Sequence, residues 1–155
     1  MPHLALVCTT STGSHPEGPA VQLSESVHQI LAAGEVFGEL FYAEFFRRCP
    51  EAKSSFGDAD MQRQALVVTM TLTTVQQYHD GGYPAVEAYL KHLGVVHDRK
   101  NVPMETYPHW RAAMLHTLAR MHGNQWNREI ASEWGLALDG ALRVMLHGVE
   151  ERGKE

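Results

Sequence analysis

Three histidines, His92, His97 and His109, stand five and twelve residues apart in a chain of 155 residues. A neutral imidazole can bind a metal through one ring nitrogen when a hydrogen bond holds the other. His97 follows Leu93 by four residues, about one helical turn, so the Leu93 carbonyl could accept that bond. Its neighbours place His97 on an apolar face, where a metal-bearing cofactor could be buried. A histidine here can equally be an ordinary core or surface residue, and spacing alone does not decide.

The other two histidines are predicted to lie at the surface. His92 precedes His97 by five residues, which is about 140° around a helix, so the two rings should face different directions. His109 falls at the start of the following helix, where a solvated side chain is the usual case.

The segments that must position His97 are predicted to be helical. Apolar residues recur at helical spacing, Gly or Pro ends most runs, and no convincing strand alternation occurs beyond about residue 22. The predicted fold class is therefore all-α, with six to seven helices. A polar corner at residues 54–60 and a loop at 98–102 interrupt the pattern. The predicted helices cover residues 21–34, 35–50, 60–78, 84–97, 103–123 and 127 onward.

Composition indicates one globular domain. A formal net charge of −5 argues against nucleic acid or an anionic membrane as the partner, and no stretch resembles a secretory signal or a membrane span. Two cysteines, Cys8 and Cys49, suggest no disulfide framework, so a cytoplasmic protein with reduced thiols is expected. We expect a flexible N-terminal extension at residues 1–21, one domain at 22–151 and a short tail at 152–155.

The segment YLKHLGVVHDRKNVPMETYPHW, residues 89–110, resembles the proximal region of globins. It contains the "LG..H" run that ends the proximal helix, a loop that closes on a valine, and a Tyr-Pro pair. The TYP form is similar to bacterial single-domain haemoglobins and to the globin domain of flavohaemoglobins, and the resemblance covers roughly residues 22–150. It implies a globin fold around one haem b, with His97 as the proximal iron ligand and Tyr107 beside it.

A second stretch, LFYAEFFRRCPEAKSSF, is similar to the "FY..LF…P…..F" run of the same families. The resemblance places Tyr42 at the distal position, Phe46 behind it and Phe56 against the haem. A tyrosine in a Phe-rich helix can also simply pack, with its hydroxyl bonded to a carbonyl. Further residues expected to line the haem are Leu93, Trp110 and, on the last helix, Met145.

Two glutamines in MQRQALVV are candidates for a second distal hydrogen-bond donor. If Gln64 is distal, Ala65 is the small residue at a helix crossing and Val68 lies over the iron. If Gln62 is distal, Leu66 covers the iron and an arginine occupies the crossing, where burying an unpaired guanidinium is costly. We favour Gln64 for that reason. A hydroxyl and an amide would then both donate to a partly anionic bound dioxygen.

One feature of these families is missing. They carry a glutamate on the last helix that, with the tyrosine, bonds the proximal imidazole. That position here is Val149, and Glu150 is about 100° away around the helix. The electron donation that such a glutamate supports is therefore not expected.

Three functions are compatible with the resemblance. The first is reversible binding of dioxygen, with NO and CO as further ligands, by an oxygen carrier, store or scavenger. The second is nitric oxide dioxygenation, which would require a separate reductase. The third is a haem-based gas sensor.

Overall fold

The computed structural model describes residues 23–154, and these form an all-α domain, which confirms the predicted fold class. The extension predicted at residues 1–21 lies outside this part of the chain. No helix among the described residues is long and apolar enough to cross a membrane. The helices are α1 (Leu23–Ala32), α2 (Val36–Arg48), the 3-10 helix η1 (Pro50–Phe56), α3 (Met61–Gly81), α4 (Pro84–Arg99), α5 (Thr106–His122), the 3-10 helix η2 (Gly123–Gln125) and α6 (Arg128–Arg152).

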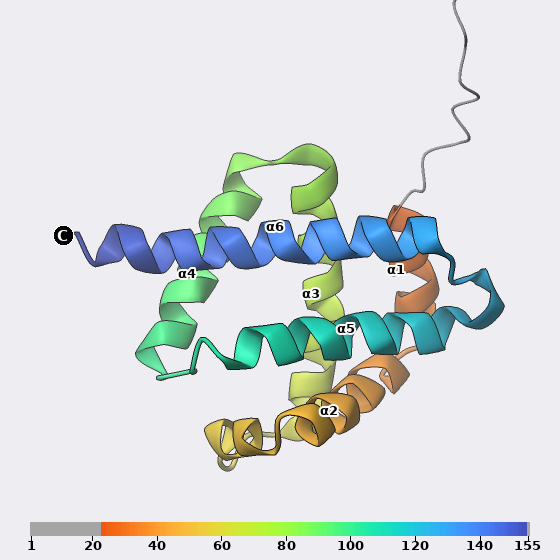
Figure 1. Cartoon of the computed structure of the whole chain (residues 1–155), viewed down its shortest axis with the longest axis horizontal. Coiled ribbons are helices and arrows are strands. Elements are labelled where there is room, and N and C mark those ends of the chain that lie inside the picture. The colour runs from red at the N-terminus through yellow and green to blue at the C-terminus, as the bar shows by residue number, and fades with distance from the viewer. Residues whose placement is uncertain (1–22, 155) are drawn as a thin grey trace, which may run out of the picture.

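The long helices cross one another in two layers. Figure 1 shows α5 and α6 side by side, with α3 crossing behind them and the C-terminal half of α6 lying over α4. Helix α2 packs on both α5 and α3. Figure 1 shows the C-terminal end of α4 beside the start of α5, while the N-terminal half of α3 passes behind α5 and α2.

Several helix boundaries differ from the prediction. The first three residues of the corner predicted at residues 54–60 belong to a 3-10 helix, η1, instead of an open loop. Helix α4 continues to Arg99, because backbone hydrogen bonds carry it through the first two residues of the predicted loop. Helix α5 begins at Thr106, three residues after Pro103, and the Thr106 hydroxyl donates to the Pro103 carbonyl at 2.6 Å.

Two glycines allow pairs of helices to touch backbone to backbone. A Cβ atom added to Gly38 in α2 would lie 2.2 Å from the carbonyl oxygen of Ala65 in α3. One added to Gly94 in α4 would lie 2.0 Å from the carbonyl oxygen of Met145 in α6. Glycine inside a helix costs about 1 kcal/mol relative to alanine, and close packing is the physical reason to keep it. These contacts fix α2 on α3 and α4 on α6.

A buried polar cluster joins α1 to α5 and α6. The His122 side chain, in a residue 5% exposed, has Nε2 2.6 Å from the Ser26 hydroxyl oxygen and Nδ1 3.1 Å from the Gln29 amide oxygen. Trp134 Nε1 donates to the same Ser26 oxygen at 2.9 Å. Because the amide oxygen only accepts, Nδ1 carries the ring proton and Nε2 accepts from the Ser26 hydroxyl. With a neutral His122 ring, each of these polar groups therefore has a hydrogen-bond partner.

We predict that acid destabilises the domain through His122. Burial lowers the pKa of His122 below its ordinary 6.5, so the unfolded chain takes up a proton at a pH where the folded chain does not. The contribution of His122 is thus complete above pH 6.5 and is lost as the pH falls below that value. Urea unfolding of the wild type and of His122→Gln, between about pH 8 and pH 5, measures it.

The His122→Gln variant serves as the comparison because an amide donates and accepts but does not titrate. It should cost about 1 kcal/mol at the upper pH, from weakened hydrogen bonds, and should flatten the pH dependence. An equally steep loss of unfolding free energy in both proteins would refute the role of His122.

Candidate functional site

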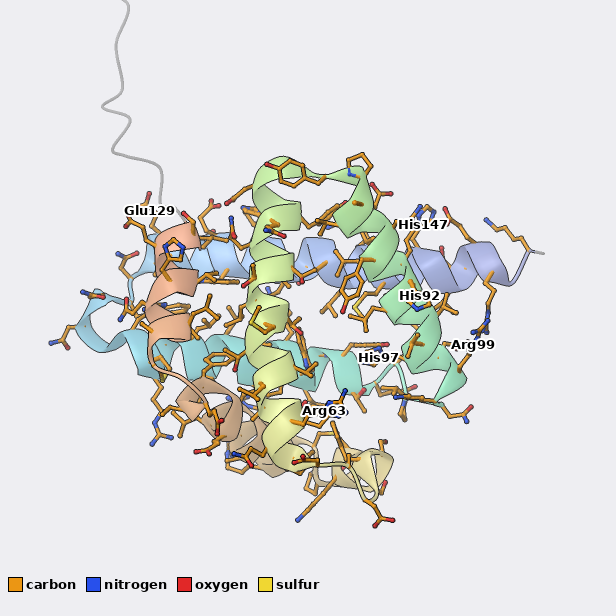
Figure 2. The ribbon with its side chains drawn as sticks, turned by 180° about the vertical axis from the view of Figure 1, so that it is seen from behind. Arg63, His92, His97, Arg99, Glu129 and His147 are labelled. Carbon is orange, nitrogen blue, oxygen red and sulfur yellow. The ribbon has the colours of Figure 1, made fainter. Side chains whose placement is uncertain are left out.

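His97 lies in the last turn of α4, where its side chain is partly buried. Its Nδ1 lies 2.8 Å from the carbonyl oxygen of Leu93, so the predicted hydrogen bond is present. A carbonyl only accepts, which means that Nδ1 carries the proton and Nε2 keeps a lone pair. Figure 2 shows the ring extending from α4 toward α3. Nε2 is therefore the nitrogen available to bind a metal.

The other two histidines of this region, His92 and His109, are exposed, as predicted. Within residues 23–154, no group of three or more His, Cys, Asp and Glu side chains is arranged to hold a metal ion. Of the three histidines, His97 is the one that combines partial burial with an oriented ring.

Tyr107 lies in the first turn of α5. Burial raises the pKa of its phenol, and the negative charge of Asp98 raises it further. Among the described residues the ring of His97 bonds to neither Tyr107 nor α6, where Val149 and the exposed Glu150 stand in place of the glutamate. A backbone carbonyl, and not a carboxylate, orients the imidazole.

Tyr42, Phe46 and Phe56 form a cluster of three rings that joins α2 to η1. The centroid of the Tyr42 ring lies 5.6 Å from that of Phe46 and 5.4 Å from that of Phe56, and the two phenylalanine rings are 5.4 Å apart. Burial alone raises the pKa of Tyr42 to about 12, with no protein hydrogen bond contributing. The hydroxyl is protonated at neutral pH, as in an ordinary tyrosine, and can therefore donate a hydrogen bond.

The contact between α2 and α3 determines which side of α3 faces inward. Ala65 is 2% exposed and touches Gly38, so it occupies a helix crossing. Val68 is 4% exposed, and Gln64 is partly buried. Gln64 and Val68 are four residues apart and therefore share a face of the helix.

The alternative pair, Gln62 and Leu66, lies outside this group. Leu66 is 45% exposed, and the exposed Gln62 donates its amide to Glu35 at 3.3 Å. Arg63 is exposed as well, and Figure 2 shows it at the start of α3. With Ala65 held at the crossing, the helix phase turns these side chains outward.

The remaining predicted lining residues border the core. Leu93, Tyr107 and Trp110 are partly buried and pack against buried apolar residues. The Trp110 ring meets Phe41 edge-on, with centroids 5.9 Å apart. Met145 is 8% exposed, and its backbone touches α4 at Gly94.

Two features beside the site were not predicted from the sequence pattern. One is the crossing partner Gly38, whose signal is an isolated glycine within an otherwise strong apolar helix. The other is an ion pair between Asp98 in α4 and Arg152 at the end of α6. The two charges are 54 residues apart in the sequence, and no local pattern connects them.

Comparison with known proteins matches this chain to one protein family and to a relative. Residues 39–145 match the family model named Globin, a span that includes Tyr42, Gln64 and His97. Leghemoglobin-1 from Lupinus luteus is 33% identical over 81 residues, which cover 52% of this chain and 53% of that protein. The chain thus spans about half the length of this relative in the alignment. Because the family match extends over most of the described domain, the chain belongs to the globin family.

Proposed function

We propose that this chain is a haem b globin that binds dioxygen reversibly, and also NO and CO, as an oxygen carrier, store or scavenger. The observation that carries the proposal is the oriented imidazole of His97, whose Nδ1–H is bonded to the Leu93 carbonyl and whose Nε2 is free. The globin family implies a haem cofactor. When bound, haem would supply an iron that His97 would hold and at which a diatomic gas could bind.

Four of the predicted lining residues suit a flat and largely apolar cofactor. Helices α2, η1, α4 and α5 each contribute a partly buried apolar side chain, namely Phe46, Phe56, Leu93 and Trp110. Residues of this size usually bury more of their surface. A cofactor that covered them would remove this apolar area from water, which is favourable.

The distal donors in the proposal are Tyr42 and Gln64. The Tyr42 hydroxyl is protonated at neutral pH, as phenols ordinarily are, and burial raises its pKa further, to about 12. An amide N–H on the partly buried Gln64 would be the second donor. Hydrogen bonds to a partly anionic ligand are stronger than neutral ones, so release of dioxygen should be slow.

The proximal partner of His97 favours reversible binding over oxidative chemistry. A carboxylate bonded to Nδ1 would increase the basicity of the imidazole. Here the partner is the neutral carbonyl of Leu93, and Val149 offers no acceptor. Within the described residues, the hydrogen bond to the His97 ring is therefore made by a neutral group.

Two finer points belong to the same proposal. The Tyr/Gln pair supports a likeness to bacterial single-domain haemoglobins. The scarcity of cysteines, two in 155 residues, supports a cytoplasmic location.

We predict that His97→Ala abolishes stoichiometric haem binding, because it removes the nitrogen ligand. The matched control is His92→Ala, which changes an exposed histidine of the same helix and should bind one haem per chain. Titration with haemin, followed by the Soret absorbance, measures both. Retention of a full five-coordinate haem spectrum by His97→Ala would refute the assignment of His97 as the haem ligand.

Tyr42→Phe should raise the dissociation rate of dioxygen at least tenfold, which corresponds to about 1.4 kcal/mol for one lost hydrogen bond. Displacement of dioxygen by CO in a stopped-flow instrument measures this rate. Tyr78→Phe, at a partly buried tyrosine on α3 outside the site, should leave the rate unchanged. An unchanged rate in Tyr42→Phe would show that the hydroxyl is not a donor.

The two glutamines give a further test by the same measurement. Gln64→Leu should raise the dissociation rate about fivefold, since loss of one hydrogen bond costs about 1 kcal/mol. Gln62→Leu should have no effect, because Gln62 is exposed and bonded to Glu35. The reverse result would place Gln62 in the pocket and require a different helix phase in the holoprotein.

A further inference from the structure

His97 occupies a part of α4 that the helix itself secures poorly. It lies two residues before Arg99, the last residue of the helix. The carbonyl groups in the last turn of a helix have no N–H partner within the helix. The carbonyl of His97 accepts from the N–H groups of Lys100 and Val102, each at 3.1 Å. These bonds close the turn locally. They do not determine where the turn sits relative to the helices that face it.

Helix α6 holds α4 on both sides of His97. Three residues before it, Gly94 meets the backbone of Met145. One residue after it, the Asp98 carboxylate accepts from Nη2 of Arg152. The ligand thus lies between a backbone contact and an ion pair, both made with the same helix.

The contact between α4 and α6 extends toward the start of α4. A Cβ atom added to Gly148 would lie 2.5 Å from the carbonyl oxygen of Lys91, and Lys91 Nζ donates to Glu151 at 3.1 Å. The N-terminal side of the crossing is therefore held by close backbone contact as well as by charge. Among the described residues that follow His97 in α4, Asp98 makes the one side-chain hydrogen bond to α6, through its ion pair with Arg152.

We propose that Asp98 and Arg152 are positioning residues for His97. Their ion pair holds the last turn of α4 on α6 and so sets the direction in which the imidazole meets the iron. This inference rests on the proposed function, in which His97 is the haem ligand. It gives the end of α6 a role in a chain whose Val149 does not bond the imidazole.

Because the Asp98–Arg152 ion pair is exposed, an effect on the position of His97 can be distinguished from an effect on the stability of the fold. The Arg152 and Asp98 side chains are 39% and 42% exposed, and ion pairs as exposed as this contribute little to the free energy of unfolding. Variants of either residue should therefore fold and bind haem. Their effect should be seen at the bond between the imidazole and the iron.

The test uses the haem-bound protein and the variants Arg152→Gln and Asp98→Asn. Resonance Raman spectra of the ferrous ligand-free form report the iron–histidine stretching band, and transfer of haem to an excess of an acceptor apoprotein reports its dissociation. We expect the band to shift or broaden in both variants. Haem loss should rise about threefold, the scale of one partly exposed ion pair.

The matched control is Arg111→Gln, which breaks an ion pair between an arginine in α5 and Asp139 in α6. Its two side chains are 34% and 45% exposed, close to the values for Arg152 and Asp98. This variant should leave the band and the haem loss unchanged. The exchange Asp98→Arg with Arg152→Asp should move both readouts back toward the wild type.

A wild-type band and wild-type haem loss in Arg152→Gln would overturn the positioning role while leaving the haem assignment intact. Equal changes in Arg111→Gln would overturn it too, because the effect would then follow from any loss of charge pairing on α6. Failure of the proposed function has a different signature, since His97→Ala would keep its haem spectrum.

Discussion

The hydrogen bond between Nδ1 of His97 and the Leu93 carbonyl selects the tautomer on which the candidate site depends. With the proton on Nδ1, Nε2 has a lone pair and can bind a metal. With the proton on Nε2, the same ring would present an N–H and could not. The bond joins two residues one turn apart in the same helix. The bond can therefore form whenever α4 is helical, and it requires no contact with another helix.

The opposite side of the site depends on contacts between different helices. Gly38 lets α2 approach the backbone of α3 at Ala65, and this contact determines the rotation of α3 about its axis. The rotation in turn places Val68 inward and Leu66 outward. Tyr42 packs against three phenylalanine rings, Phe41 and Phe46 from its own helix and Phe56 from η1. This arrangement of side chains therefore forms only when α2, η1 and α3 are packed together.

This difference explains how much of the molecule could be predicted from its sequence. The bond from His97 to Leu93 and the outward direction of His92 follow from helical spacing, which is local. Spacing could not choose between Gln62 and Gln64, because the choice requires the partner of Ala65 at the crossing. The roles expected for Tyr42 and Tyr107 came from family resemblance, since periodicity does not separate a packed tyrosine from a hydrogen-bond donor.

The helix ends and the long-range polar contacts show the same limit. The loop predicted after His97 is helical for two more residues, and this extension brings Asp98 to Arg152. The buried contacts of His122 with Ser26 and Trp134 join residues about a hundred positions apart. Periodicity carries no information about such pairs, because each depends on which helices cross and where.

The five consecutive residues 93–97 contain both the proposed ligand, His97, and the carbonyl that orients its ring. The residues proposed to contact the gas are spread over α2, η1 and α3. Under the proposed function, the bond to the haem iron and the hydrogen bonds to the gas are therefore encoded by different segments. Substitution of Tyr42 or Gln64 could then change the lifetime of the bound gas without altering the turn that presents His97. Ligand lifetime could diversify in this domain while that turn stays the same.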